Sequence, residues 1–89
     1  MPSTSLEIIN QRGLHARASA KFVETVEAHD AAAQVSHDGQ TVNGDSIMGL
    51  LMLAAHKGVT IDVSTSGPDA QVLLTALTDL IENRFGETD

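Results

Sequence analysis

The apolar residues of this chain switch between two periods, and this switching limits the possible folds more than any other feature. Four short segments have the two-residue period of strands with one buried face, or continue such a strand after a turn: residues 6–9, 33–37, 40–42 and 59–64. Three longer segments repeat apolar residues at intervals of three and four, as helices with one buried stripe do: residues 16–28, 46–58 and 67–85. Strands that are apolar on one face favour an open sheet with all helices on a single side. The order β-α-β-β-α-β-α therefore predicts an α+β fold.

Short local signals place the ends of these elements. Asp38 and Gly39 supply the two positive-φ positions of a tight hairpin turn. Ser46 can accept a hydrogen bond as the N-cap of the second helix, and residues 56–58 are expected to close it, with His56 beside the last carbonyls. The inward-facing residues expected in the first and last helices are Ser19, Phe22, Val23 and Val26, and then Leu73, Leu74, Leu77, Leu80, Ile81 and Phe85.

Length and charge limit the class of protein. The 89 residues fit one small domain, residues 1–89, with a single modest core. Twelve acidic residues against five basic ones give a net charge of -7. This balance argues against binding to nucleic acid or to an anionic membrane, because both need an extended positive surface. We also expect no membrane insertion. The longest apolar run, residues 47–55, has nine residues and is too short to span a membrane. We therefore expect the partners to be proteins.

Neither a secretion signal nor a metal site is expected. Residues 1–5 lack the basic segment and apolar core of a signal peptide, and the chain has no cysteine, so we expect a cytoplasmic protein. His29, His37 and His56 share no ligand spacing with one another or with the acidic residues. The glycines form no nucleotide-binding loop, and no serine lies in a nucleophile elbow. We expect no metal, no cofactor and no independent catalytic machinery.

The positive charge of the chain gathers around one histidine. Arg12, Arg17 and Lys21 are three of the five basic residues, and they lie within ten positions of one another around His15. His15 directly precedes an Ala/Lys/Glu-rich run with good helix propensity, so it should lie at a helix start. The unpaired N–H groups at a helix start suit an anion, and a phosphate most readily. Here those groups belong to Ala16, Arg17 and Ala18.

His15 itself has the chemistry of a phosphoryl acceptor. A neutral imidazole is a nucleophile, and the positive end of a helix dipole together with Arg17 favours the neutral ring. The same field would stabilise a negative phosphoryl group once it is attached. The competing interpretation is an ordinary exposed or capping histidine, which is the more common role of a lone histidine before a helix.

Two separate motifs carry a resemblance to a known family. GLHAR at residues 13–17 and NGDSIMGLL at residues 43–51 resemble the HPr phosphocarrier family of the phosphoenolpyruvate-dependent phosphotransferase system, over nearly the whole chain. The resemblance implies an open-faced β-sandwich, with a four-stranded antiparallel sheet of order first, fourth, second, third and three helices on one face. Periodicity alone leaves a ferredoxin-like order open. The family usually has proline after the arginine, whereas this chain has Ala18, which leaves a free N–H and alters the entry into the helix.

The resemblance implies a stoichiometric phosphocarrier and not an enzyme. His15 would take a phosphoryl group from phosphorylated enzyme I and pass it to an enzyme IIA domain. Arg17 would pair with the phosphoryl oxygens, while backbone N–H groups, those of Ala16, Arg17 and Ala18, would orient them. We expect a monomer.

The resemblance also implies a regulatory site and a docking surface. Ser46 would be phosphorylated by a dedicated kinase, the HPr kinase/phosphorylase, although the residues alone favour a simple helix cap. Metabolic regulators are further candidate partners. The expected docking residues are Arg12, Ala16, Ala20, Lys21, Ile47, Met48 and Leu51.

Two alternatives remain at the level of sequence. One is a regulatory protein of the same fold, whose phosphorylation states are read by metabolic or nitrogen-control partners without sugar transport. The other is a small-molecule-binding ferredoxin-like module in which His15 is only a loop residue. The motifs fit a sugar-transport system and a nitrogen-regulatory system equally well.

Overall fold

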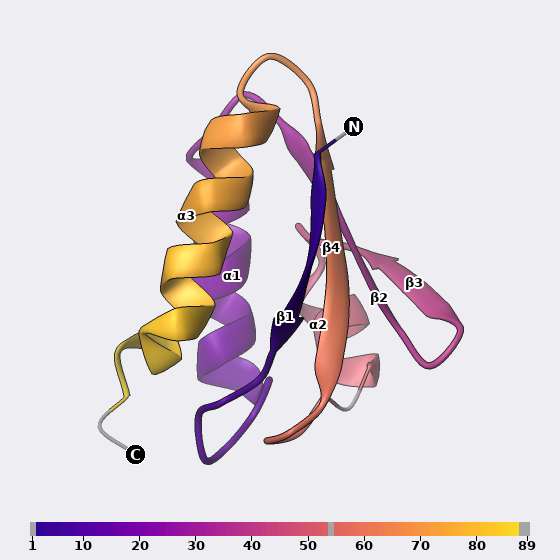
Figure 1. Cartoon of the computed structure of the whole chain (residues 1–89), viewed down its shortest axis with the longest axis vertical. Helices are drawn as coiled ribbons and strands as arrows, with labels where there is room; N and C mark the ends of the chain where they lie inside the picture. Colours follow the sequence, from indigo (N-terminus) through magenta and orange to yellow (C-terminus); the bar gives the residue numbers. More distant parts are fainter. Residues whose placement is uncertain (1, 54, 88–89) are drawn as a thin grey trace.

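A four-stranded antiparallel sheet carries the helices on one of its faces (Figure 1). The computed structural model describes residues 2–53 and 55–87. The elements, in chain order, are β1 (Ser3–Glu7), α1 (Ala16–Glu27), β2 (Ala32–His37), β3 (Gln40–Asn43), α2 (Ile47–Met52), β4 (Thr60–Ser66), α3 (Ala70–Glu82) and a 3-10 turn η1 (Arg84–Gly86). The strand order is β1-β4-β2-β3, so the order that the family resemblance implies is confirmed.

The central strand β4 aligns the apolar residues of its neighbours on one face. Leu6 lies opposite Ile61, and Val35 lies opposite Val63, and all four side chains are buried. The intervening residues point to the other face, where small polar side chains pair across strands, as in the hydrogen bond of 2.8 Å between the hydroxyls of Ser36 and Thr41. The sheet is therefore covered by helices on its apolar face and polar on its open face, as the alternating pattern predicts.

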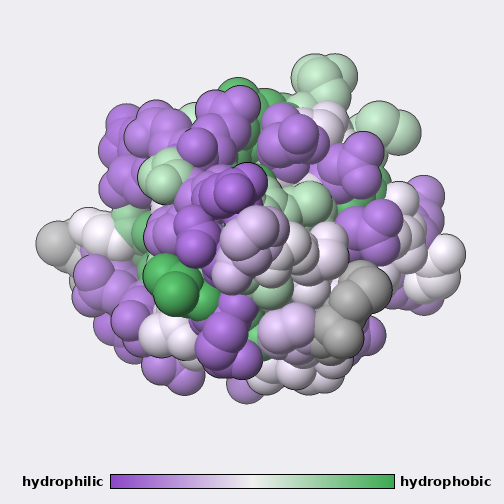
Figure 2. All heavy atoms as spheres, turned by 90° about the horizontal axis from the view of Figure 1, so that it is seen from above, coloured by the Kyte–Doolittle hydropathy of each residue, from purple (hydrophilic) through white to green (hydrophobic). Residues whose placement is uncertain are grey.

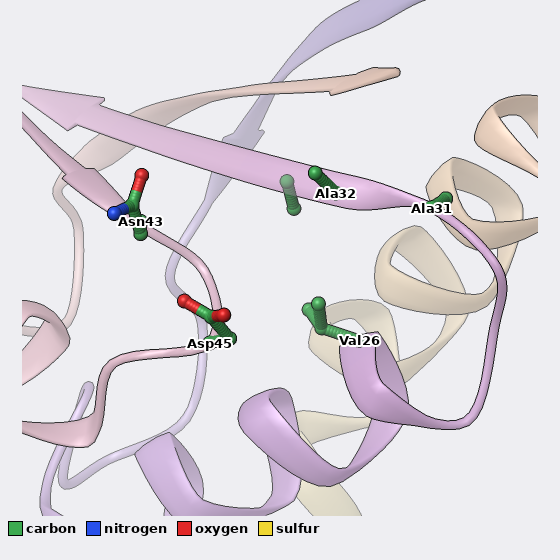
Figure 3. A pocket seen from close by; sticks show the side chains of 6 residues that line it. Val26, Ala31, Ala32, Asn43 and Asp45 are labelled. Carbon is green, nitrogen blue, oxygen red and sulfur yellow. The ribbon is translucent and has the colours of Figure 1, made fainter. Parts of the chain in front are cut away.

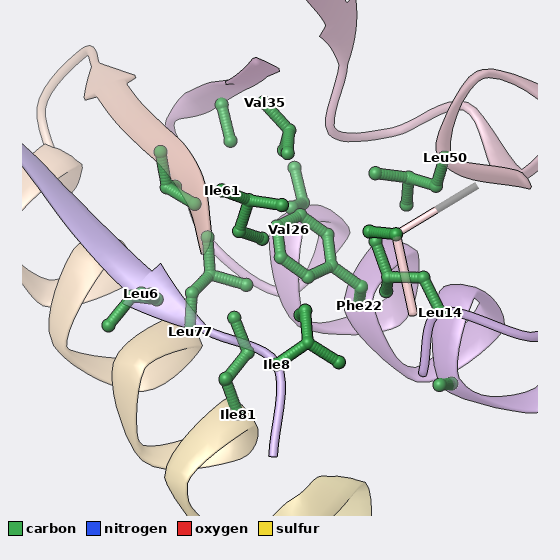
Figure 4. Packing of buried hydrophobic residues seen from close by; sticks show 14 of the residues in the cluster. Leu6, Ile8, Leu14, Phe22, Val26, Val35, Leu50, Ile61, Leu77 and Ile81 are labelled. Atoms are coloured by element: carbon green, nitrogen blue, oxygen red, sulfur yellow. The ribbon is translucent and has the colours of Figure 1, made fainter. Parts of the chain in front are cut away.

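The core is aliphatic around two buried aromatic rings, and Figure 4 shows one of them, Phe22, among its aliphatic neighbours. Phe22 reaches from α1 to the centre of the cluster, and Phe85 closes it from η1; both rings are almost fully buried. Burial of each such side chain contributes roughly 1.5–3 kcal/mol. The helix stripes are confirmed, since these residues are buried: Ser19, Phe22, Val23, Val26, Leu73, Leu74, Leu77 and Ile81. Leu80 is only partly buried.

The predicted hairpin and helix cap are both present. Asp38 and Gly39 have φ values of 52° and 81°, so this turn uses the two left-handed positions expected of it. The Ser46 hydroxyl accepts a hydrogen bond of 3.0 Å from the Gly49 N–H and caps α2.

Several predicted boundaries are wrong, and for the first strand and the second helix contacts distant in sequence explain the difference. The first strand covers residues 3–7 instead of the predicted 6–9, because Ser3 to Glu7 are the residues that pair with β4. Helix α2 ends at Met52 and is not closed by residues 56–58, because the Ala55 carbonyl accepts a hydrogen bond of 2.8 Å from the Leu14 N–H. His56 accordingly contacts the Lys57 carbonyl and not those of the helix end.

The last boundary lies near the C-terminal end of α3. Phe85 continues the apolar stripe in sequence, but α3 ends at Glu82 and Phe85 belongs to η1. Phe85 has φ 54°, which an α-helix cannot contain.

The two ends of the molecule along its longest axis are distinct. α1 starts at the lower end in Figure 1, where the β1–α1 loop and the C-terminal segment also lie. The opposite end is mostly hydrophilic, with apolar atoms scattered across it (Figure 2). No helix among the described residues is long and apolar enough to cross a membrane.

Candidate functional site

The loop before α1 is held by hydrogen bonds that leave it little freedom. The buried Asn10 side chain donates to the Gly13 carbonyl at 2.8 Å, and the Gly13 N–H donates back to the Asn10 carbonyl at 3.2 Å. Leu14 is buried and donates its N–H to Ala55 across the loop. These bonds therefore hold in place the backbone that leads into the next residue, His15.

His15 is the N-cap of α1. Its backbone is extended, with φ -79° and ψ 180°, and its carbonyl accepts the N–H of Ser19 at 2.8 Å as the first helical bond. The ring nitrogen Nδ1 accepts the Arg17 N–H at 3.3 Å. The side chain is 23% exposed. The expected placement of His15 at a helix start is therefore confirmed, with Nδ1 beside the positive end of the helix.

The other ring nitrogen contacts a residue that the sequence interpretation missed. Nε2 of His15 meets the Glu87 carboxylate, and the Asn10 amide donates to the other Glu87 oxygen at 3.2 Å. Burial tends to raise the pKa of Glu87, but hydrogen bonds from His15 and Asn10 and the positive charges of His15 and Arg12 outweigh it and hold that pKa below its usual value. The contact spans 72 positions in sequence, so no local pattern indicates it.

The remaining residues predicted on α1 and its loop fall into three environments. Arg12, Arg17 and Ala16 are exposed near the start of the helix, and Ala20 is half-buried. Ala18 is fully buried, so its side chain packs inside and only its backbone could meet a ligand. Lys21 is half-buried and donates to the Phe85 carbonyl, which ties it to the C-terminal segment.

The predicted docking residues of α2 lie on a helix that packs against α1. Ile47 and Met48 are exposed, Met48 by 68%, and Leu51 is half-buried. Met52 is also 68% exposed and was not among the predicted docking residues. Three of the four large apolar side chains that are exposed in the described part of the chain therefore belong to α2.

A separate hollow, which none of these residues lines, lies between the C-terminal half of α1 and the strands β2 and β3 (Figure 3). Its lining residues are Val26, Ala31, Ala32, Ala33, Asn43 and Asp45. It has no cationic side chain, so it does not suit a phosphate. The described residues also contain no group of three or more histidine, aspartate or glutamate side chains that could hold a metal ion.

The arrangement around His15 suits the transfer of an anionic group. One ring nitrogen faces a helix start with its N–H groups and Arg17, and the other faces a carboxylate. The first side can receive a negative group, and the second fixes the ring.

Comparison with known proteins identifies the relatives of this chain. A family model described as "PTS HPr component phosphorylation site" matches residues 2–83. The phosphocarrier protein HPr of Neisseria meningitidis is 51% identical over 87 residues, covering 98% of each chain. The structure of HPr-C-His from Thermoanaerobacter tengcongensis is similar at a TM-score of 0.95 and 39% identity, covering all of both chains. The HPr dimer from the same organism is similar at a TM-score of 0.78 and 40% identity, covering 98% of this chain and all of that one.

Proposed function

The chain belongs to the HPr family of phosphotransferase-system phosphocarriers, and from this premise we propose that His15 accepts a phosphoryl group from phosphorylated enzyme I and passes it to an enzyme IIA domain. One observation carries the proposal. Nδ1 of His15 accepts the Arg17 N–H at the start of α1, so its lone pair faces the positive end of a helix. The nitrogen that would attack the phosphorus therefore lies beside the N–H groups that would bind the phosphoryl oxygens.

The transfer uses groups that already surround that atom. Nδ1 attacks the phosphorus, and the bond from phosphorus to the donor atom breaks with its electron pair going to the donor. The backbone N–H groups of Ala16, Arg17 and Ala18 then hold the phosphoryl oxygens, while the exposed Arg17 guanidinium pairs with them from outside. The 3.3 Å contact between the Arg17 N–H and Nδ1 is long for a hydrogen bond, so it is readily exchanged for a phosphoryl oxygen.

Incubation with enzyme I and phosphoenolpyruvate tests the proposal directly. The intact protein should gain the mass of one phosphoryl group, and the gain should be lost in acid and kept in alkali, as a phosphohistidine is. Transfer onward is tested by adding candidate enzyme IIA proteins and following the loss of that mass. A chain that gains no mass with active enzyme I is not a carrier of this system.

Replacing Arg17 with alanine should slow the transfer without abolishing it. The guanidinium contributes one charge-assisted interaction to the phosphoryl group, worth about 1.5–3 kcal/mol, or roughly 10- to 100-fold in rate. The backbone N–H of residue 17 remains in the variant. Rapid-quench phosphorylation by enzyme I measures the rate. An unchanged rate in Arg17→Ala would remove the guanidinium from the mechanism.

Ser46 is the proposed site of regulatory phosphorylation by an HPr kinase/phosphorylase. Its hydroxyl caps α2 through the Gly49 N–H, and the exposed Ile47 and Met48 follow it directly. A phosphate at this cap is compatible with the helix dipole, so it should leave the fold intact. Its charge would lie within the surface proposed to meet acidic partners.

Replacing Ser46 with aspartate should weaken docking and leave stability intact. Asp and Asn both cap helices well, so Ser46→Asn is the neutral control that isolates the charge. The apparent KM for enzyme I should rise roughly threefold to tenfold in Ser46→Asp relative to Ser46→Asn at low salt, and the difference should shrink as salt rises. The melting temperature of Ser46→Asp should equal or exceed that of Ser46→Asn. A KM difference between the two variants that stays the same as the salt concentration rises would overturn the electrostatic account.

The proposed docking surface combines the exposed apolar residues of α2 with the cations around His15. α1 and α2 are in contact, so a partner that reaches His15 can also cover Ile47, Met48 and Met52. Apolar methionines adapt to several partners, and Arg12 and Arg17 can meet acidic groups. This surface suits enzyme I and enzyme IIA in turn.

We propose that the chain acts as a monomer in the cytoplasm. The similar HPr from Thermoanaerobacter tengcongensis has also been crystallised as a dimer. Light scattering at micromolar concentration distinguishes the two states of this chain, and a mass of twice the monomer would contradict the proposal.

A further inference from the structure

The C-terminal segment follows an unusual path to reach His15. Arg84, Phe85 and Gly86 all have left-handed backbones, with φ of 54°, 54° and 78°. A non-glycine residue in this region costs of order 1–3 kcal/mol and persists only where surrounding contacts impose it. Here the imposed turn brings Glu87 back to the start of α1.

Contacts of the folded molecule impose this turn. The Phe85 ring is buried in the core, and its carbonyl accepts a hydrogen bond from the Lys21 ammonium on α1. The Glu87 N–H donates to the Arg84 carbonyl at 2.9 Å, which closes the turn. The position of Glu87 is therefore set by the core and not by chance contact of a free end.

The Glu87 carboxylate is itself held on both oxygens. One oxygen accepts from the Asn10 amide at 3.2 Å, and the other meets Nε2 of His15; the side chain is only 14% exposed. Because its pKa lies below the usual value, Glu87 is ionised at neutral pH. An ionised carboxylate has no proton to donate, so the proton of this contact must belong to Nε2.

The two contacts of His15 require the same tautomer. A neutral imidazole carries one proton, and the backbone N–H of Arg17 can only donate, so Nδ1 must be the unprotonated nitrogen. Two other histidines have the opposite arrangement. Nδ1 of His29 faces the Thr25 carbonyl at 2.8 Å, and Nδ1 of His56 faces the Lys57 carbonyl at 3.0 Å, so in both neutral rings Nδ1 carries the proton.

We infer that Glu87 is a positioning residue, which keeps the proton of His15 on Nε2 and thereby presents the Nδ1 lone pair to the phosphoryl donor. The inference rests on the proposed function, since it assigns a residue to that same site. During transfer the N–P bond forms at Nδ1, and the Nε2 proton stays in place, donated to Glu87. The ring then carries a positive charge, which the carboxylate compensates.

Tautomers measured by NMR test the inference without any phosphoryl donor. Imidazole nitrogens labelled with ¹⁵N report directly which nitrogen is protonated when the rings are neutral. In the parent protein His15 should carry its proton on Nε2, while His29 and His56 report the opposite tautomer in the same spectrum. Glu87→Ala should shift His15 toward a mixture of tautomers. The matched control is Glu82→Ala, which removes an exposed carboxylate from the end of α3 and should change nothing.

Transfer kinetics provide the second measurement. Glu87→Ala should lower kcat for phosphorylation by enzyme I on the order of tenfold, the lower end of the range for hydrogen-bond partners that orient metal-bound histidines, with little change in KM. Nε2 protonation that is the same in Glu87→Ala and the parent, or an unchanged kcat, would overturn the inference and leave the proposed function standing. Failure of the parent to accept phosphate would instead overturn the proposed function, whatever the tautomer.

Discussion

Replacing His15 with alanine should abolish phosphoryl acceptance while the fold stays intact. No other histidine in the described part of the chain lies at the start of α1, so no residual transfer is expected. The ring contributes little to the core, but it caps α1, and loss of a cap costs about 1 kcal/mol. For a domain of this size that cost lowers the melting temperature by roughly 4–8 °C. Intact mass after incubation with enzyme I, together with circular dichroism, measures both effects.

Two other histidines serve as controls for this result. His29 and His56 bond only to neighbouring carbonyls and lie outside the site, so His29→Ala and His56→Ala should accept phosphate at the rate of the parent. Acceptance by a folded His15→Ala protein would place the phosphoryl group on another residue, and peptide mapping would locate it.

The largest loss of stability is expected from Gly13→Ala. Gly13 has φ 65°, and a Cβ added there would lie 2.5 Å from the Ala55 carbonyl oxygen and 2.7 Å from the His56 Cα. These neighbours are backbone atoms and cannot turn aside as a side chain could. Strain and steric overlap together should cost about 3 kcal/mol or more. The melting temperature should fall by roughly 12–24 °C.

Gly39→Ala separates the two causes of that loss. Gly39 has φ 81°, similar to Gly13, but nothing lies within 4 Å of the Cβ position. Its replacement should cost only about 1 kcal/mol, from backbone strain alone. Denaturant unfolding of both variants gives the difference, which measures the close approach of the β1–α1 loop to Ala55. Equal losses would show that this approach relaxes without cost.

Features specified by neighbouring residues could be predicted from the sequence. The Asp38-Gly39 turn needs only two residues that tolerate positive φ, and the Ser46 cap needs only a hydroxyl three positions before a free N–H. The end of α2 could not be predicted. The apolar run continues through residue 55, so periodicity gives no stop, and the helix ends where Ala55 is required as an acceptor for Leu14.

The residues of the candidate site likewise divide into those that the local sequence predicts and those that it does not. The position of His15 at a helix start follows from the local sequence, as does the gathering of Arg12 and Arg17 around it. Glu87 could not be identified, because the sequence after α3 offers only Phe85 as a sign that the C-terminal segment packs back on the molecule. Met52 was missed because the apolar pattern of α2 does not reveal which side the core occupies.

Under the proposed function, the covering of Nε2 by Glu87 limits how many phosphoryl groups the protein can pass on per second. With that side of the ring closed, donor and acceptor must both approach Nδ1, so the two cannot be bound at once. Each phosphoryl group then requires one complete dissociation. At a typical association rate constant of about 10⁶ M⁻¹s⁻¹, a complex with a Kd of about 10 μM separates about ten times per second, whereas a nanomolar complex lasts many minutes. A phosphocarrier that reacts only through Nδ1 therefore transfers fastest when its affinity for both donor and acceptor is low.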